Sequence, residues 1–111
     1  MLARKPAHIT GLMLALMCLL ALGMPTPARA DAALSQQKHC NACNAMDGAI
    51  TGPSLKAVAQ KYANDRAAAD KLTARILKGG TGVWGSVPMP ANPQLSEAEA
   101  RRLAVWILGL K

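Results

Sequence analysis

The sequence of 111 residues has no phenylalanine, and Trp84, Trp106 and Tyr62 are its only aromatic residues. No stretch alternates apolar and polar residues in the manner that predicts a half-buried β-strand, and no segment repeats elsewhere in the chain. Ala, Leu and Val supply most of the apolar side chains, so the material for a hydrophobic core is thin. These absences favour one small all-α domain.

The first thirty residues differ in composition from the rest. Arg4 and Lys5 precede an apolar run over about residues 9–24, prolines follow, and Ala28-Arg29-Ala30 supplies small residues two apart. The run is shorter than the roughly 20 apolar residues that a membrane-spanning helix needs. We therefore predict a secretory signal peptide over residues 1–30, cleaved after Ala30, with export to the periplasm and no stable membrane insertion afterwards. The domain then occupies residues 31–111.

Acidic residues are few. Of the 13 Lys and Arg residues, Arg4, Lys5 and Arg29 leave with the leader, while all 6 Asp and Glu residues remain, so the expected mature chain carries a net charge of +4. No cluster of arginines with interleaved aromatic residues is present, which argues against a nucleic-acid partner. Two interpretations stay open: the positive surface guides an acidic docking partner, or the lysines simply solubilise the helix faces.

Helix signals occupy most of the expected mature chain. Asp31 can cap the first helix, Ser54 starts the second, and Ser96 with Glu99 forms a capping box at the start of the last. We expect four helices, over about residues 31–43, 54–63, 66–78 and 96–110. A chain of about 80 residues barely offsets its conformational entropy with one core, so a large apolar prosthetic group at its centre would supply what is missing.

The segment from Thr81 to Leu95 has no helical periodicity, and three prolines forbid a continuous helix there. Loops of more than about 12 residues in compact domains are usually functional. Trp84 and Met89 in this loop therefore need an explanation. Met normally serves where its flexibility helps packing, whereas Met89 is held between Pro88 and Pro90, which favours a fixed role for its sulfur.

Cys40 and Cys43 form a C-x-x-C pair, which is compatible with a disulfide, a metal site or thioether bonds to haem. A structural zinc or iron–sulfur site needs four ligands, and Cys18 leaves with the leader. A thioredoxin-type pair needs an α/β scaffold, and no strand pattern is present. Haem is the use that also predicts a soft axial ligand on a separate loop, and Met89 matches it, whereas Met46 is explained by ordinary packing.

The chain resembles the small bacterial class I c-type cytochromes of the periplasm along its whole expected mature length. The matching segments are residues 40–43 (CNAC), 52–55 (GPSL), 76–80 (ILKGG), 82–90 (GVWGSVPMP) and the terminal helix with Trp106. The resemblance implies one haem c bound through Cys40 and Cys43, with Met89 as axial iron ligand. It also implies that the Pro53 carbonyl accepts a hydrogen bond from the proximal ligand and that Trp84 lies near the haem propionates. One-electron shuttling between periplasmic redox proteins would be the function, without enzymatic turnover.

Asn44 departs from the pattern, because the family has its iron-ligating His at this position. Asn is shorter than His by about the width of a ring, and an amide oxygen is a poor iron ligand beside a thioether, so direct ligation is not expected. Five positions along a helix place His39 roughly 140° away from Asn44, so His39 does not replace the missing ligand.

Three functions remain open at this stage. The first is the electron carrier that the resemblance implies. The second is an open-site haem protein that binds small ligands or peroxide, with weak peroxidase activity. The third is a haem-free pseudo-cytochrome with a Cys40–Cys43 disulfide, since the attachment machinery of this family also recognises the histidine.

Overall fold

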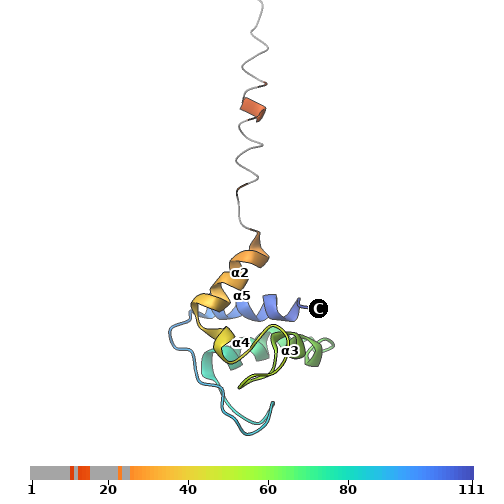
Figure 1. Ribbon diagram of the computed structural model, residues 1–111, viewed down its shortest axis with the longest axis vertical. Helices are drawn as coiled ribbons and strands as arrows, with labels where there is room; N and C mark the ends of the chain where they lie inside the picture. The colour runs from red at the N-terminus through yellow and green to blue at the C-terminus, as the bar shows by residue number, and fades with distance from the viewer. Residues whose placement is uncertain (1–10, 12, 16–22, 24–25) are drawn as a thin grey trace, which may run out of the picture.

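The computed structural model describes residues 11, 13–15, 23 and 26–111, so most of the expected signal peptide lies outside the described residues. Within them the chain forms four α-helices and one short 3-10 helix (Figure 1): α2 (Pro27–Gln37), η1 (Cys40–Ala42), α3 (Leu55–Lys61), α4 (Ala68–Lys78) and α5 (Glu97–Leu108). These residues contain no β-strand, only an isolated bridge between Gly80 and Met89. The predicted all-α fold is confirmed. In this described part of the chain, no helix has the length and apolar character needed to cross a membrane.

Two helix starts follow directly from local sequence. The Ser54 hydroxyl accepts a hydrogen bond from the Ala57 backbone N–H at 3.1 Å, which caps α3. At α5 the Ser96 hydroxyl accepts from the Glu99 N–H, and the Glu99 carboxylate accepts from the Ser96 N–H at 3.0 Å, which completes the predicted capping box. The bond from the Ser96 N–H also lowers the pKa of Glu99.

The first helix differs from the prediction at both ends. In the full chain α2 begins at Pro27, so Asp31 lies inside it and does not cap it. The helix ends before the cysteines because His39 takes a left-handed conformation with φ of 60°. A left-handed residue cannot continue an α-helix, and the chain enters the short η1 turn instead. The other helices differ from the prediction by only a few residues at their ends.

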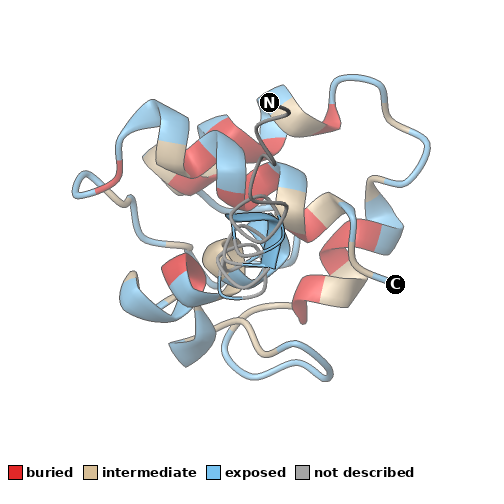
Figure 2. Ribbon diagram, turned by 90° about the horizontal axis from the view of Figure 1, so that it is seen from above, coloured by how far each residue is buried: buried red, intermediate tan, exposed pale blue. Residues whose placement is uncertain are grey.

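The core lies where α5 packs against α2, α3 and α4. Ala100 and Ala104 on α5 are fully buried, and their small side chains allow the neighbouring helices to approach closely. Buried positions lie on the helix sides that face one another, whereas the loops are largely exposed (Figure 2). The remaining large core residues are Leu34, Leu55, Val58, Leu72, Ile76, Leu95, Leu103 and Ile107. The first described helix, α2, and the last, α5, therefore contact one another in the fold.

Candidate functional site

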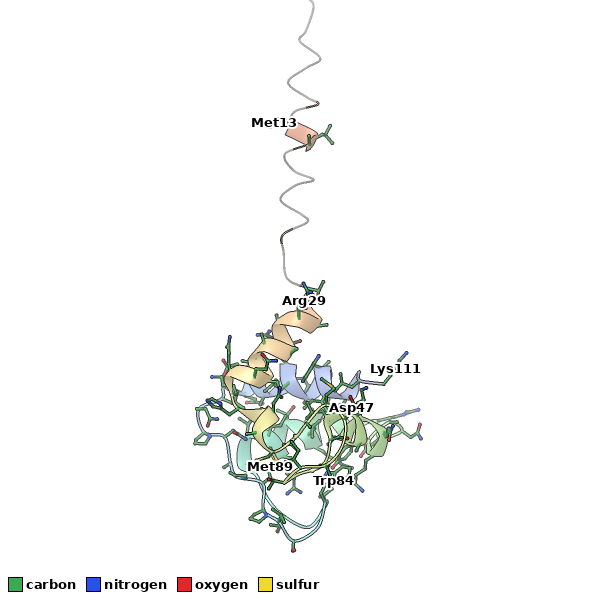
Figure 3. The ribbon with its side chains drawn as sticks, in the orientation of Figure 1. Met13, Arg29, Asp47, Trp84, Met89 and Lys111 are labelled. Carbon is green, nitrogen blue, oxygen red and sulfur yellow. The ribbon has the colours of Figure 1, made fainter. Side chains whose placement is uncertain are left out.

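A cavity of about 430 Å³ opens between the cysteine turn, α3, α4 and the loop that follows α4. Its volume lies in the range of about 300–1,000 Å³ that is usual for cofactor and ligand sites. Cys43 and Asn44 contribute one side of the lining, and Trp84 and Met89 contribute another. Figure 3 shows Met89 and Trp84 on the side of the molecule away from α2. Residues far apart in the sequence thus share one apolar space.

The cysteine turn presents two free thiols. The backbone N–H groups of Cys43 and Asn44 both donate to the Cys40 carbonyl, at 3.3 and 3.0 Å, which closes the turn. Cys43 lines the cavity, while Cys40 packs against the core. Burial raises the pKa of the Cys40 thiol above its usual range, and hydrogen bonding to Ser35 opposes this shift less strongly. Both thiols are unpaired, in contrast to the disulfide alternative.

Asn44 has a defined partner. Its side-chain nitrogen donates a hydrogen bond of 2.8 Å to the Pro53 carbonyl oxygen. Gly52 makes room for this contact, because a Cβ atom there would lie 2.6 Å from Asn44 Nδ2. The Gly52 N–H in turn donates to the Cys43 carbonyl at 2.9 Å. The carbonyl that the resemblance assigned to the proximal ligand is therefore occupied by the amide of Asn44.

Met89 is held through its backbone. Its N–H donates to the Gly80 carbonyl at 2.9 Å, and its carbonyl accepts from the Gly80 N–H at 3.0 Å. Gly79 permits this approach with φ of +67°, since a Cβ atom there would collide with the backbone of residues 89–91. The Met89 side chain is half-buried, packs against the core and lines the cavity. These bonds fix the backbone that carries the Met89 thioether beside the cavity.

Two residues that sequence reasoning missed complete the site. The Asn92 side chain donates to the Ile76 carbonyl at 2.8 Å, and its backbone N–H donates to the Leu77 carbonyl at 3.1 Å. These bonds satisfy carbonyls at the end of α4 and tie the loop to that helix. Arg75 is the only charged side chain that lines the cavity in the described part of the chain. Neither role has a local sequence signal, because both depend on contacts made after folding.

The remaining candidates differ in position. Trp84 is 44% exposed at the edge of the cavity, and the Lys61 ammonium lies 5.3 Å from its ring centroid. Pro53 lines the cavity beside Asn44. His39 is exposed and does not line the cavity, as predicted, although the reason is its left-handed conformation. Met46 is exposed as well, so its expected packing role is limited.

The residues that are present fit a large flat apolar group with acidic edges. The lining is mostly apolar, Cys43 provides a thiol at its edge with Cys40 nearby, and Met89 provides a soft thioether ligand. Arg75 supplies one cation to neutralise an acidic substituent. These features match haem c, with Cys40 and Cys43 on the attachment turn. Asn44 is the exception, because its amide is engaged with Pro53 and is too short to replace an imidazole.

Comparisons with known proteins agree with this fit. The family model described as "Cytochrome c" matches residues 29–111. Cytochrome c-551 of Allochromatium vinosum is 44% identical over 94 residues, which cover 85% of this chain and all of that protein. Cytochrome c-552 of Nitrosomonas europaea is 46% identical over 76% of this chain and 82% of that protein.

The crystal structure of wild-type Nitrosomonas europaea cytochrome c552 matches with a TM-score of 0.70 at 45% identity. The match covers 72% of this chain and 99% of that structure. The range matched by the family model includes the cysteine turn and the Met89 loop. The chain therefore belongs to the cytochrome c family, as a small all-α haem c protein that carries electrons.

Proposed function

We propose that the chain is a periplasmic electron carrier that shuttles single electrons between redox proteins. In this proposal Cys40 and Cys43 bind the haem covalently, Met89 is an axial ligand, and Pro53 and Trp84 form part of its surroundings. The supporting observation is the single cavity that Cys43, Pro53, Trp84 and Met89 line together, with Cys40 on the same turn. The bound haem supplies a one-electron redox couple.

The chain's own residues hold that group and exclude water. Leu55, Val58, Leu72 and Ile76 form the buried part of the lining and keep the interior of low polarity. The Gly80–Met89 bridge restricts backbone movement on the ligand side. A rigid apolar site changes little between redox states, which suits rapid transfer of an electron. No step in this function requires a general acid, a general base or a nucleophile.

Arg75 has a positioning role in this proposal. Its guanidinium donates to the Gly79 carbonyl at 3.4 Å and lines the cavity, where it can pair with an acidic substituent of the haem. Charge-assisted bonds of this type are stronger than neutral ones, especially where water is excluded. Arg75 would thereby link the end of α4 to the edge of the bound group.

The rim of the cavity suits a transient redox partner with an acidic surface. Ile50, Trp84 and Val87 line the cavity and are 60%, 44% and 58% exposed, so each adds exposed apolar surface at its rim. Lys61 adds positive charge directly over Trp84. Several other basic side chains are paired within the molecule, among them Lys56 with Asp47, Arg101 with Asp70, and Arg102 with Asp31. A small apolar contact with charge guidance is typical of weak electron-transfer encounters.

The experiment that tests this function is expression in a bacterium with a periplasm, followed by mass measurement and haem staining on a denaturing gel. The expected product starts at Asp31, carries covalent haem and shows a reversible reduced-minus-oxidised spectrum. A periplasmic chain of the same length without haem would refute the electron-carrier proposal and support the haem-free pseudo-cytochrome instead. A haem-loaded chain that retains residues 1–30 would refute only the signal peptide.

A further inference from the structure

We propose that Ser35 and Asn41 are positioning residues for Cys40, and that together they set how readily the Cys40 sulfur reacts before haem is attached. Ser35 has one hydroxyl proton, for which the Asn41 oxygen and the Cys40 sulfur compete. The inference builds on the proposed attachment of haem at Cys40, but it concerns the chain without haem and is therefore tested separately.

The Ser35 hydroxyl is a buried polar group on α2. Ser35 is only 1% exposed, and it follows Leu34 of the core. A buried hydroxyl without a hydrogen-bond partner costs about 1–3 kcal/mol, so Ser35 needs a partner. Its Oγ atom donates a hydrogen bond of 2.8 Å to the side-chain oxygen of Asn41. This bond joins α2 to the η1 turn, and it depends on the left-handed conformation of His39, where the chain leaves the helix.

The same hydroxyl also serves Cys40. Hydrogen bonding to Ser35 lowers the pKa of the Cys40 thiol, which means that the hydroxyl donates to the thiolate form. Serine has a single proton to donate. The Ser35 proton stays on Asn41 while the Cys40 sulfur carries its own proton, and it must leave Asn41 to stabilise the thiolate. Because the thiolate is the reactive form of cysteine, Ser35 favours reaction of Cys40 and Asn41 opposes it.

The charged groups around the turn do not replace these two hydrogen bonds. Among the helices, η1 contacts α2. The charged or titratable side chains of α2 and of the residues before Cys40 are exposed or paired elsewhere: Arg29, Asp31 with Arg102, Lys38 with Glu99, and His39. Burial and hydrogen bonds shift the pKa of Cys40, and burial has the larger effect. Within this buried turn, the Ser35 hydroxyl is the side-chain group that stabilises the Cys40 thiolate.

The test is the rate at which iodoacetamide alkylates Cys40 in the full reduced chain without haem, at about pH 7. Mass spectrometry of the peptides separates Cys40 from the other cysteines. The reaction forms a sulfur–carbon bond, releases iodide and leaves the thiol proton to the solvent. In Ser35→Ala the thiolate loses its donor, so Cys40 should react about three- to tenfold more slowly. In Asn41→Ala the Ser35 proton has no competing acceptor, so Cys40 should react about two- to threefold faster.

The opposite signs distinguish this role from a purely structural one. If the Ser35–Asn41 bond only held the turn together, both variants would expose Cys40 and both would react faster. Cys43 is the internal control, because it lines the cavity and its rate should stay the same in all three chains.

Faster alkylation of Cys40 in Ser35→Ala would overturn the inference, as would an unchanged or slower rate in Asn41→Ala. Equal Cys40 rates in all three chains would also overturn it, since the turn would then not hold these groups together before haem is attached. These results leave the haem-attachment proposal intact. A periplasmic chain that gains no haem refutes that proposal, whereas the alkylation rates still decide the roles of Ser35 and Asn41.

Discussion

Met89 and Asn44 stand on two walls of the same cavity, and the chain fixes them by different means. The Met89 wall, residues 79–92, is fixed through backbone hydrogen bonds between Met89 and Gly80 and through the Asn92 bonds to α4. The Asn44 wall, residues 40–53, fixes the side chain of residue 44 itself through one bond to Pro53. The position of Met89 is therefore independent of its side-chain chemistry, whereas the position of the residue 44 side chain depends on a suitable N–H donor.

The surroundings of residue 44, which we call the scaffold, can therefore be considered separately from the side chain that residue 44 places there. The Asn44 wall keeps the Pro53 carbonyl, the space provided by Gly52 and the turn closed on Cys40. A planar side chain with an N–H at residue 44 can use the same carbonyl and the same space. The amide of Asn44 satisfies the scaffold without reaching as far into the cavity as an imidazole does. The Asn44 wall thus keeps the carbonyl and the space that a histidine at residue 44 would use.

The largest effect is expected from Asn44→His, which tests whether the scaffold of the Asn44 wall is intact. The imidazole N–H can donate to Pro53 in place of the Asn44 amide, and the ring then extends into the cavity. We expect a low-spin spectrum typical of His/Met ligation and a higher yield of haem-loaded protein. The matched control is His39→Asn, which should change neither, because His39 is exposed and outside the cavity. An unchanged spectrum in Asn44→His would mean that the wall no longer fits a histidine.

Met89→Ala tests the other wall. Removal of the sulfur should abolish its charge-transfer band and lower the reduction potential, since Met ligation raises the potential. The measurement is absorption spectroscopy with a redox titration of the haem-loaded protein. Met46→Ala is the control, because Met46 is exposed and outside the cavity, and it should behave as the natural chain does. Equal spectra for the two variants would contradict the assignment of Met89.

Substitution of one glycine in each wall compares their rigidity. Gly79→Ala combines a positive φ with a collision against backbone, so we expect a loss of about 3 kcal/mol in the free energy of unfolding. Gly52→Ala meets mainly the end of the Asn44 side chain, which can move, and should cost about 1 kcal/mol. Urea unfolding of both variants measures the difference. Similar losses would show that the two walls are equally rigid.

A smaller effect than that of Gly79→Ala is expected from Asn92→Ala on the Met89 wall. The variant loses the side-chain bond to the Ile76 carbonyl but keeps the backbone bond to Leu77, so about 1–2 kcal/mol of unfolding free energy should be lost. Gln94→Ala is the control, because the Gln94 side chain bonds only to Asn92 in the described residues and is exposed. Urea unfolding measures both variants. Equal free energies of unfolding would mean that the Asn92 side chain does not help to hold the Met89 wall.

The fold was predictable to a large extent, because its signals are local. Ser54 and the Ser96–Glu99 capping box mark two helix starts, and Gly79 and Gly80 mark the end of α4. The first helix was less predictable. Asp31 is a good capping residue in isolation, but the full chain starts α2 at Pro27 and ends it through the left-handed His39. Single-residue propensity cannot show which of several possible helix ends the packing selects.

The sequence by itself determined the chemistry that is available: two thiols on one turn, a methionine between prolines, and an asparagine where the family has histidine. Only the tertiary structure decided which of these groups share a cavity, and that the Asn44 amide bonds to Pro53 while Asn92 and Arg75 serve the opposite wall and the lining. The reason is physical. Side-chain identity is a local property, whereas a hydrogen bond between distant residues exists only after packing brings donor and acceptor together.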